Sequence, residues 1–224
     1  MREAIILLGG RATRFRPYTD DKPKALIKIN DKPILQHQIE WLKEHDVKHI
    51  ILAAGYKSNM INSYIFDKFV EDDQVGITIV KEKERLGTGG AIRNAMKKLI
   101  DSDEFLVVNG DNISNVDLDK IYKNGASTIT AWNDTYRFGI MVMDDKGNIN
   151  FTEKPEFWIN AGITLLDKKR MKKMLPKKGS LEKEVLPNLE LKVHYHGNKK
   201  SEYWYTFDSQ RDKEEFERKW KKQN

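Results

Sequence analysis

The sequence predicts an α/β protein built on a Rossmann-like, doubly wound and mostly parallel mixed sheet. The first observation behind this prediction is that apolar runs of strand length, at residues 4–8, 47–53 and 105–108, alternate with segments of helical period. The second observation is size, because 224 residues with 39% hydrophobic and 33% charged residues suit one soluble domain with a sizeable core. Strands and helices that alternate in this way form right-handed βαβ units in a parallel sheet.

The first half of the chain supports this alternation element by element. A helix is expected over residues 33–45, because a proline suits a first turn and apolar residues recur on one face. Ser58 is the predicted cap of a second helix, and a strand over residues 76–80 follows that helix. A glycine-rich loop from Leu86 then leads into a helix that is expected to end near residue 100.

In the second half the alternation of strands and helices ends, and this change predicts a small antiparallel lobe. Strand-like segments follow one another with little helix between them, at residues 128–132, 139–143, 148–152 and 159–166. Short helices and further strands are expected at residues 167–175, 181–188, 191–196 and 204–207. Ser180 is a predicted N-cap, and Phe216 and Trp220 lie on a final amphipathic helix.

Composition narrows the classes of function. The net charge of +6 favours an anionic ligand, but 34 acidic residues are interspersed with 40 basic ones, so no nucleic-acid partner is implied. The lysine-rich run at residues 168–178 is interpreted as a solvated helix face. The absence of cysteine excludes a disulfide framework and a thiolate metal site. No apolar stretch is long enough for a signal peptide or a membrane span, so no membrane partner is expected and the cytoplasm is the predicted location.

The stretch that follows the first strand carries the strongest functional signal. It reads L-G-G-R-A-T-R-F-R-P from Leu8 to Pro17, and a K-P-K segment ending at Lys24 follows it. A glycine pair directly after a strand lets backbone N–H groups approach a ligand, while the arginines of the stretch and Lys24 supply positive charge. The stretch is neither a Walker A loop nor a dinucleotide-binding fingerprint, because both need other spacings. It therefore predicts a polyphosphate site in which cationic side chains do most of the binding.

Asp111 comes directly after an apolar strand, in the segment V-V-N-G-D. A carboxylate at a strand end beside a phosphate loop suits Mg²⁺, which takes one or two carboxylates together with phosphate oxygens. A solvated turn aspartate or a helix cap is the alternative, and the neighbouring loop favours the metal. Ligands of open α/β sheets bind outside the carboxyl ends of the strands. We therefore expect the loops at residues 9–24, 87–90 and 109–111 to lie together.

The whole pattern resembles the sugar-1-phosphate nucleotidyltransferases, whose signature reads approximately L-x-G-G-x-G-T-R-x-x-P-x-T-x-x-x-P-K. Ala12 stands at that family's third glycine. The segments L-G-T-G-G-A, I-N-A-G and S-L-E-K-E-V-L-P look most like compact heptose- or mannose-1-phosphate guanylyltransferases. The segment W-Y-T-F-D-S-Q-R-D-K instead resembles the ending of glucose-1-phosphate cytidylyltransferases.

The resemblance implies the glycosyltransferase-A-like nucleotidyltransferase fold as one domain over residues 1–224. Its nucleotide-binding half would cover about residues 1–125, and its sugar-phosphate-binding half about residues 126–224. Because the chain ends soon after this core, no fused β-helix acyltransferase domain is expected.

The resemblance also implies a reaction. A sugar 1-phosphate would attack the α-phosphorus of a nucleoside triphosphate in line, with Mg²⁺ and without a protein nucleophile, to give a nucleotide-sugar and pyrophosphate. The implied catalytic residues are Arg14, Lys24 and Asp111, and the implied metal ligands are Asp111 and Asp208. The implied nucleotide-binding residues are Leu8, Gly9, Gly10, Ala12, Thr13, Glu82, Gly87 and Thr88. The implied sugar-phosphate-binding residues are Gly139, Glu153, Lys154 and Asn160.

Glu82 bears on the choice of base. It precedes Gly87 by five residues, which is the place of a residue that often reads the base in the resembled family. A carboxylate accepts hydrogen bonds from the N1–H and N2–H₂ groups of guanine, so GTP is favoured. A protonated or outward-turned Glu82 would remove this preference.

Several interpretations stay open. A glucose-1-phosphate-type cytidylyltransferase that uses CTP is one, and a non-catalytic nucleotide-sugar-sensing regulatory subunit, motivated by Ala12 and the unusual ending, is another. A choline-phosphate-type cytidylyltransferase is disfavoured by the E-K-P and I-N-A-G segments. Asp208 is alternatively an N-cap of the last helix. The identity of the sugar, the base and the presence of a homo-oligomer also stay open.

Overall fold

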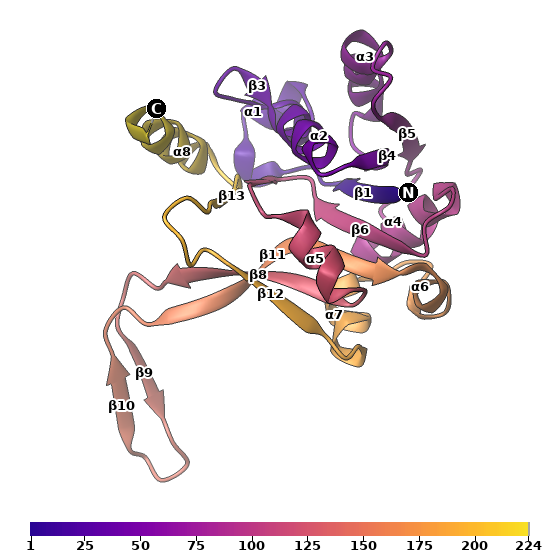
Figure 1. The fold of residues 1–224 in the computed structure, drawn as a ribbon. Coiled ribbons are helices and arrows are strands. Elements are labelled where there is room, and N and C mark those ends of the chain that lie inside the picture. Colours follow the sequence, from indigo (N-terminus) through magenta and orange to yellow (C-terminus); the bar gives the residue numbers. More distant parts are fainter. Residues whose placement is uncertain (224) are drawn as a thin grey trace.

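The structure, a computed structural model, describes residues 1–223. Its centre is a seven-stranded mixed sheet with the strand order β12-β8-β11-β6-β1-β4-β5 (Figure 1). These strands are β1 (Arg2–Leu8), β4 (Val47–Ala54), β5 (Gly76–Lys81), β6 (Glu104–Asn109), β8 (Thr128–Thr135), β11 (Glu156–Asp167) and β12 (Lys192–His196). Three strand pairs accompany them, namely β2 (Lys28–Ile29) with β3 (Lys32–Pro33), β7 (Asn112–Ser114) with β13 (Trp204–Thr206), and β9 (Ile140–Met143) with β10 (Ile149–Thr152).

Helices cover both faces of the central sheet. The α-helices are α1 (Tyr18–Asp21), α2 (Ile34–Glu44), α3 (Ser58–Phe69), α4 (Gly87–Ala95), α5 (Leu118–Asn124), α6 (Lys168–Met174), α7 (Leu181–Glu184) and α8 (Gln210–Gln223). Short 3₁₀ helices are η1 (Thr13–Phe15), η2 (Lys24–Leu26), η3 (Met96–Lys98) and η4 (Leu186–Asn188). Helices α2, α3 and α5 pack on one face of the sheet, and α4, α6 and α7 pack on the other. Among the described helices, none combines the length and the apolar character that crossing a membrane requires.

Alternate residues of β1 build the two core layers. Ile6 packs into the layer beneath α2, whereas Ile5 packs into the layer beneath α4, and both are fully buried. β1 pairs in parallel with β4 on one side and β6 on the other, so Ile5 lies between Ile51 and Val107. The predicted doubly wound, mostly parallel sheet is confirmed, because apolar strands with alternating sides can be buried only between two helical layers.

The antiparallel part of the fold is also confirmed, but three of its strands, β8, β11 and β12, extend the central sheet instead of standing apart. β11 pairs antiparallel with β6 and with β8, and β12 pairs parallel with β8. Ile163 and Leu165 of β11 are fully buried in one core layer and Leu166 in the other, so β11 must lie inside a sheet that is covered on both sides. The hairpin of β9 and β10 forms a separate sheet.

Helix ends differ in detail from the predictions. The cap predicted at Ser58 is wrong, because α3 begins at Ser58 and its N-cap is Lys57. The N–H of Ser58 donates to the carbonyl of Gly55 at 3.3 Å. This bond places Ser58 inside the first turn of α3, one residue after the cap position. Helix α4 ends at Ala95 and continues only as a 3₁₀ turn. The cap predicted at Ser180 is confirmed, since its hydroxyl accepts the N–H of Lys183 at 3.2 Å.

The C-terminal segment returns to the sheet edge where β1 and β6 end. β13 pairs antiparallel with β7, and the N–H of Phe207 donates to the carbonyl of Asp111 at 2.9 Å. Phe207 and Phe216 of α8 then pack against each other with ring centroids 5.4 Å apart, in a third core cluster that also contains Phe15. This pairing carries the segment that follows β13 to the side of Asp111.

Candidate active site

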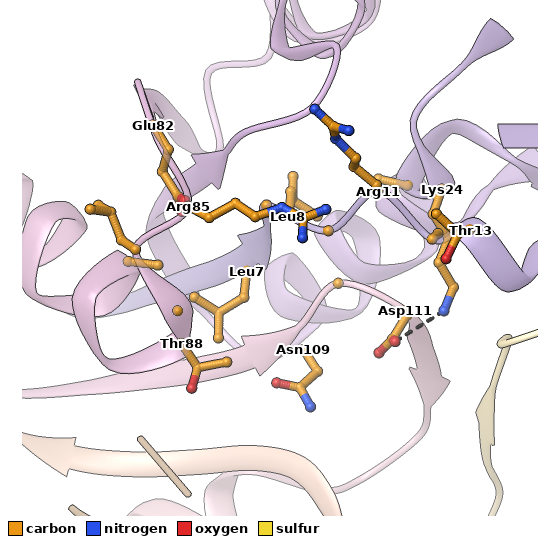
Figure 2. A pocket seen from close by; sticks show the side chains of 18 of the residues that line it. Leu7, Leu8, Arg11, Thr13, Lys24, Glu82, Arg85, Thr88, Asn109 and Asp111 are labelled. Carbon is orange, nitrogen blue, oxygen red and sulfur yellow. Dashed lines mark hydrogen bonds and ion pairs between the residues drawn. The ribbon is translucent and has the colours of Figure 1, made fainter. Parts of the chain in front are cut away.

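A cleft of about 540 Å³ opens at the carboxyl ends of β1 and β6 (Figure 2). The chain crosses from one side of β1 to the other between β5 and β6, so this edge is the topological switch point where ligands of such sheets bind. The cleft is lined by residues from the loop after β1, the loop after β5, the N-terminal turn of α4 and the loop after β6. The three loops that the sequence predicted to lie together therefore share one cavity.

The loop after β1 keeps a glycine-like backbone at Ala12. Its φ of 47° and ψ of 51° lie in the left-handed region, which costs a residue with a Cβ about 1–2 kcal/mol. Two bonds hold this turn, because the carbonyl of Ala12 accepts the N–H of Phe15 and the hydroxyl of Thr19, each at 2.9 Å. The methyl group of Ala12 packs on the cluster around Phe15, which is fully buried. Alanine at this position thus preserves the conformation that the signature glycine would adopt.

Lys24 joins the two predicted metal ligands. Its Nζ lies 3.0 Å from Asp111 Oδ2 and 3.0 Å from Asp208 Oδ1, and 12% of its side chain is exposed. Arg14 approaches the other oxygen of Asp208 at 3.6 Å. Burial raises the pKa of Asp208, but the hydrogen bond from Lys24 and the charges of Lys24 and Arg14 outweigh burial and hold that pKa below its usual range. Both carboxylates present an oxygen to the same ammonium group in the cleft.

The alternative of Asp208 as a helix cap is wrong. Its carboxylate faces Lys24 and Arg14, whereas Ser209 Oγ accepts the N–H of Asp212 at 3.4 Å at the start of α8. The carboxylate of Asp212 accepts the N–H groups of Asp208 and Ser209 at 2.9 and 2.8 Å. The cap of α8 is therefore reciprocal between Ser209 and Asp212, and Asp208 is free to face the cleft.

Glu82 lies on the opposite side of the cleft from Asp111 (Figure 2). A Cβ at Gly9 would come within 3.2 Å of Glu82 Oε1, so the glycine allows the carboxylate to lie against the loop after β1. Burial raises the pKa of Glu82, and a hydrogen bond from the backbone N–H of Leu86 opposes that rise. Its carboxylate therefore faces the cleft in a partly desolvated position.

The N-terminal turn of α4 is held by the segment that precedes α7. The N–H of Gly89 donates to the carbonyl of Gly179 at 2.9 Å. Thr88 lines the cleft, but its hydroxyl donates to Glu182 at 2.6 Å and accepts the N–H of Leu181 at 2.8 Å. The hydroxyl of Thr88 therefore positions α7. A nucleotide in the cleft would contact the other residues of this turn.

The four predicted sugar-phosphate residues do not line the cleft. Gly139 and Glu153 lie together at the base of the β9–β10 hairpin, where a Cβ at Gly139 would come within 2.9 Å of Glu153 Oε2. Lys154 follows with a φ of 47° and is exposed. Asn160 of β11 accepts the N–H of Gly162 at 2.9 Å. Gly162 in turn abuts the side chain of the cleft residue Asn109, so Asn160 is linked to the cleft through Gly162.

The predicted nucleotide-side residues all line the cleft, namely Leu8, Gly9, Gly10, Ala12, Thr13, Arg14, Lys24, Glu82, Gly87, Thr88, Asp111 and Asp208. Three further polar residues line the cleft, which are Arg11, Arg85 and Asn109. Arg11 and Asn109 belong to the loops that the sequence predicted to lie together, whereas Arg85 lies outside these loops and was missed. Figure 2 shows Arg85 extending from the Glu82 side toward Leu8. Its position three residues after Glu82, in the loop before Gly87, was the signal that could have revealed it.

Comparison with known proteins shows the family to which the chain belongs. Residues 3–206 match the family of nucleotidyl transferases, so the chain belongs to this family, as its signature predicted. A probable mannose-1-phosphate guanylyltransferase 3 of Oryza sativa subsp. japonica is 38% identical over 204 residues, covering 84% of this chain and 56% of the relative. The chain thus spans little more than half the length of that relative.

Two shorter relatives match along most of their length. The D-glycero-alpha-D-manno-heptose 1-phosphate guanylyltransferase of Campylobacter jejuni is 39% identical over 173 residues, covering 74% of this chain and 76% of the relative. The crystal structure of HddC from Yersinia pseudotuberculosis is 28% identical with a TM-score of 0.79, covering 98% of this chain and 100% of that chain. HddC in complex with GMP-PN gives a TM-score of 0.77 at 28% identity, with coverage of 98% and 100%.

Proposed function

We propose that this protein transfers the nucleotidyl group of a nucleoside triphosphate, with GTP favoured, to a sugar 1-phosphate, and that a nucleotide-sugar and pyrophosphate are the products. Similarity to the guanylyltransferases of Oryza sativa and Campylobacter jejuni supports the reaction. The complex of HddC with GMP-PN supports a guanine nucleotide as the ligand of the cleft. The single observation that carries the proposal is the ammonium of Lys24, held 3.0 Å from both Asp111 and Asp208 in that cleft.

The reaction depends on the positions of the two substrates and on neutralisation of the phosphate charge, and it does not depend on a reactive side chain. An oxygen of the sugar phosphate forms a bond to the α-phosphorus, the bond from that phosphorus to the bridging oxygen breaks, and pyrophosphate leaves with the electron pair. The attacking phosphate is already anionic, so no protein nucleophile is required. Arg14 and Lys24 neutralise the charge that builds up on the phosphates, and the loop after β1 holds the triphosphate in line.

Asp111 and Asp208 fit a divalent cation such as Mg²⁺. Their oxygens share one ammonium at 3.0 Å each, and two carboxylates together with phosphate oxygens are the ligands that Mg²⁺ prefers. No group of three or more histidine, cysteine, aspartate or glutamate side chains within residues 1–223 is arranged to hold a metal, so substrate phosphates would complete the coordination. When bound, the ion would neutralise phosphate charge. Lys24 would then donate to the phosphates.

Base selection is assigned to Glu82. Its carboxylate faces the cleft beside Gly9, where it can accept the N1–H and N2–H₂ groups of guanine. A uracil or thymine edge offers one donor between two acceptors, which matches a carboxylate less well. This chemistry favours GTP over UTP and dTTP.

The sugar 1-phosphate is assigned to the half of the chain from about residue 126. Lys154 would hold the sugar phosphate, while Glu153, Asn160 and the backbone at Gly139 would bind ring hydroxyls. Asn160 approaches the cleft through Gly162 and Asn109, which supports this direction of entry. A cytoplasmic location is proposed together with the function, because nucleoside triphosphates are its substrates.

Pyrophosphate release with Mg²⁺ tests the proposal. GTP, CTP, UTP, dTTP and ATP are each assayed against the 1-phosphates of mannose, glucose, N-acetylglucosamine and heptose. We expect release that needs both GTP and one of the sugar phosphates. Release that needs CTP and glucose 1-phosphate would replace the guanylyltransferase by a cytidylyltransferase. Silence across the panel, with a nucleotide-sugar still bound, would identify a sensor and refute the proposal.

A further inference from the structure

The β9–β10 hairpin is the part of the molecule that the proposed function leaves unexplained. Its two strands pair only with each other, and all eight strand residues are exposed. Figure 1 shows the hairpin projecting away from the body of the protein. An isolated two-stranded sheet is at best marginally stable in water, so the hairpin needs contacts beyond its own pairing.

One face of the hairpin is entirely apolar. Met141 lies opposite Phe151 and Met143 lies opposite Ile149, and cross-strand neighbours of an antiparallel pair share a face. These four residues are named here the Met141 face. Their exposed fractions are 72% for Met141, 69% for Met143 and 63% for both Ile149 and Phe151. The opposite face is mixed, because Ile140 and Val142 stand there beside Asn150 and Thr152.

The charge of the hairpin limits what could cover it. None of its eight strand residues is charged, although 33% of the whole chain is charged and the net charge is +6. The charged residues 144–146 are confined to the tip. Binding of a nucleic acid or an acidic partner requires lysine or arginine side chains, and the hairpin strands contain neither. The occupant must therefore present an uncharged apolar surface of its own.

We propose that a second copy of this chain covers the Met141 face, and that the two hairpins pack face to face about a two-fold axis. An uncharged apolar face can meet itself without bringing like charges together, which is the requirement of a self-complementary interface. Methionine suits such a contact, because its unbranched side chain adapts to an irregular partner surface. The presence of two methionines at adjacent positions of the face supplies this adaptability.

The area available agrees with a dimer. The four side chains leave about 500 Å² exposed, at the upper end of what a typical monomer shows in its largest apolar patch. Aromatic residues adjoin the base of the hairpin, where Tyr136 makes edge-to-face contacts with Phe138 at 6.0 Å and with Phe157 at 6.1 Å. Two Met141 faces packed against each other would bury about 1,000 Å² in total, which is the lower limit expected of a specific interface.

Sedimentation equilibrium of the whole chain and of charged variants tests the dimer. We expect the natural chain to be a dimer, and the double variant Met141→Lys, Met143→Lys to raise its dissociation constant at least about a hundredfold, because like charges would be buried together. Val142→Lys is the control for position, since it places a lysine on the same strand but on the opposite face. Phe66→Lys alters an equally exposed apolar residue of α3. Both controls should remain dimeric.

A charge-reversed pair separates loss of contact from loss of the hairpin fold. The double variant Met141→Glu, Met143→Glu should be monomeric alone and should form heterodimers when mixed with the lysine double variant. A monomeric natural chain at 100 µM, dissociation by Val142→Lys equal to that of the double variant, or failure of the mixture to pair would each overturn the proposal. Binding of a monomeric natural chain to phosphatidylcholine vesicles would assign the face to a membrane instead. These measurements need no substrate, so their outcome is independent of the proposed activity.

Discussion

Glu3 is expected to be the main acid-sensitive anchor of the fold. It is fully buried at the start of β1, and its carboxylate accepts the N–H groups of Ile100 at 2.9 Å and Ser102 at 3.0 Å, together with the Ser102 hydroxyl. His49 Nδ1 lies 2.7 Å from Glu3 Oε1, the oxygen that also accepts the N–H of Ile100. Burial raises the pKa of Glu3, but these hydrogen bonds outweigh burial and lower the pKa from 4.5 to about 2.

The size of the effect follows from that pKa. Because the folded-state value lies below the unfolded one, the ionised group contributes its full stability above pH 4.5 and loses it as the pH falls toward 2. Lowering a pKa from 4.5 to about 2 corresponds to about 3 kcal/mol at neutral pH, of which about 2 kcal/mol is lost by pH 3. Glu3→Gln should therefore destabilise the protein by about 3 kcal/mol at pH 7 and by about 1 kcal/mol at pH 3.

Urea unfolding of the natural chain and of Glu3→Gln at pH 7, 5 and 3 measures this difference. Glu84→Gln is the control, because its side chain is 67% exposed in a surface ion pair and should change stability by less than about 1 kcal/mol. Glu3 lies at the opposite end of β1 from the cleft, about 17 Å away along the strand, so turnover of the folded variant should be unchanged. Equal destabilisation by Glu3→Gln at pH 7 and pH 3 would refute the reasoning.

Three further predictions concern the cleft. Lys24→Met should lower turnover about 10²–10³-fold in the pyrophosphate assay, whereas Lys22→Met, which alters an exposed lysine of the same loop, should not. Ala12→Gly should leave turnover unchanged, because the backbone already has the left-handed conformation, and a large gain in rate would show that the methyl group crowds the nucleotide. Since its pKa is raised, Glu82 should lose its accepting charge at a higher pH than an ordinary glutamate of pKa 4.5. The KM for GTP should therefore rise as the pH falls, and Glu82→Gln should abolish that dependence and weaken the preference for guanine about tenfold or more.

The parallel half of the fold could be predicted from the sequence because its signals are local. Apolar runs such as residues 47–53 mark strands buried on both faces, and the glycine pair after β1 marks a close approach of backbone to ligand. The antiparallel half was predicted only as a set of strands. The apolar run of β11 shows that this strand is buried but not which strands lie beside it, so its place between β6 and β8 required the structure.

The candidate site was predictable to the extent that its residues follow strands. Asp111 and the loop after β1 were placed correctly by the rule that ligands bind at the carboxyl ends of parallel strands. Asp208 lies 97 residues further along the chain, and only the pairing of β13 with β7 explains its arrival beside Asp111. Arg85 was missed because an exposed arginine in a loop has no periodic signal. The binding roles of Glu153 and Lys154 stay predictions.

Phosphorus NMR of the protein with Mg²⁺, GTP and a sugar 1-phosphate would follow the proposed transfer between the two substrates. We expect the resonances of a nucleotide-sugar and of pyrophosphate to appear together in equal amounts, and neither to appear when the sugar phosphate is left out. Release of inorganic phosphate or pyrophosphate from GTP alone would contradict a direct transfer between the two substrates. Unchanged spectra with both ligands bound would show that the Lys24 cleft binds nucleotides without reacting them.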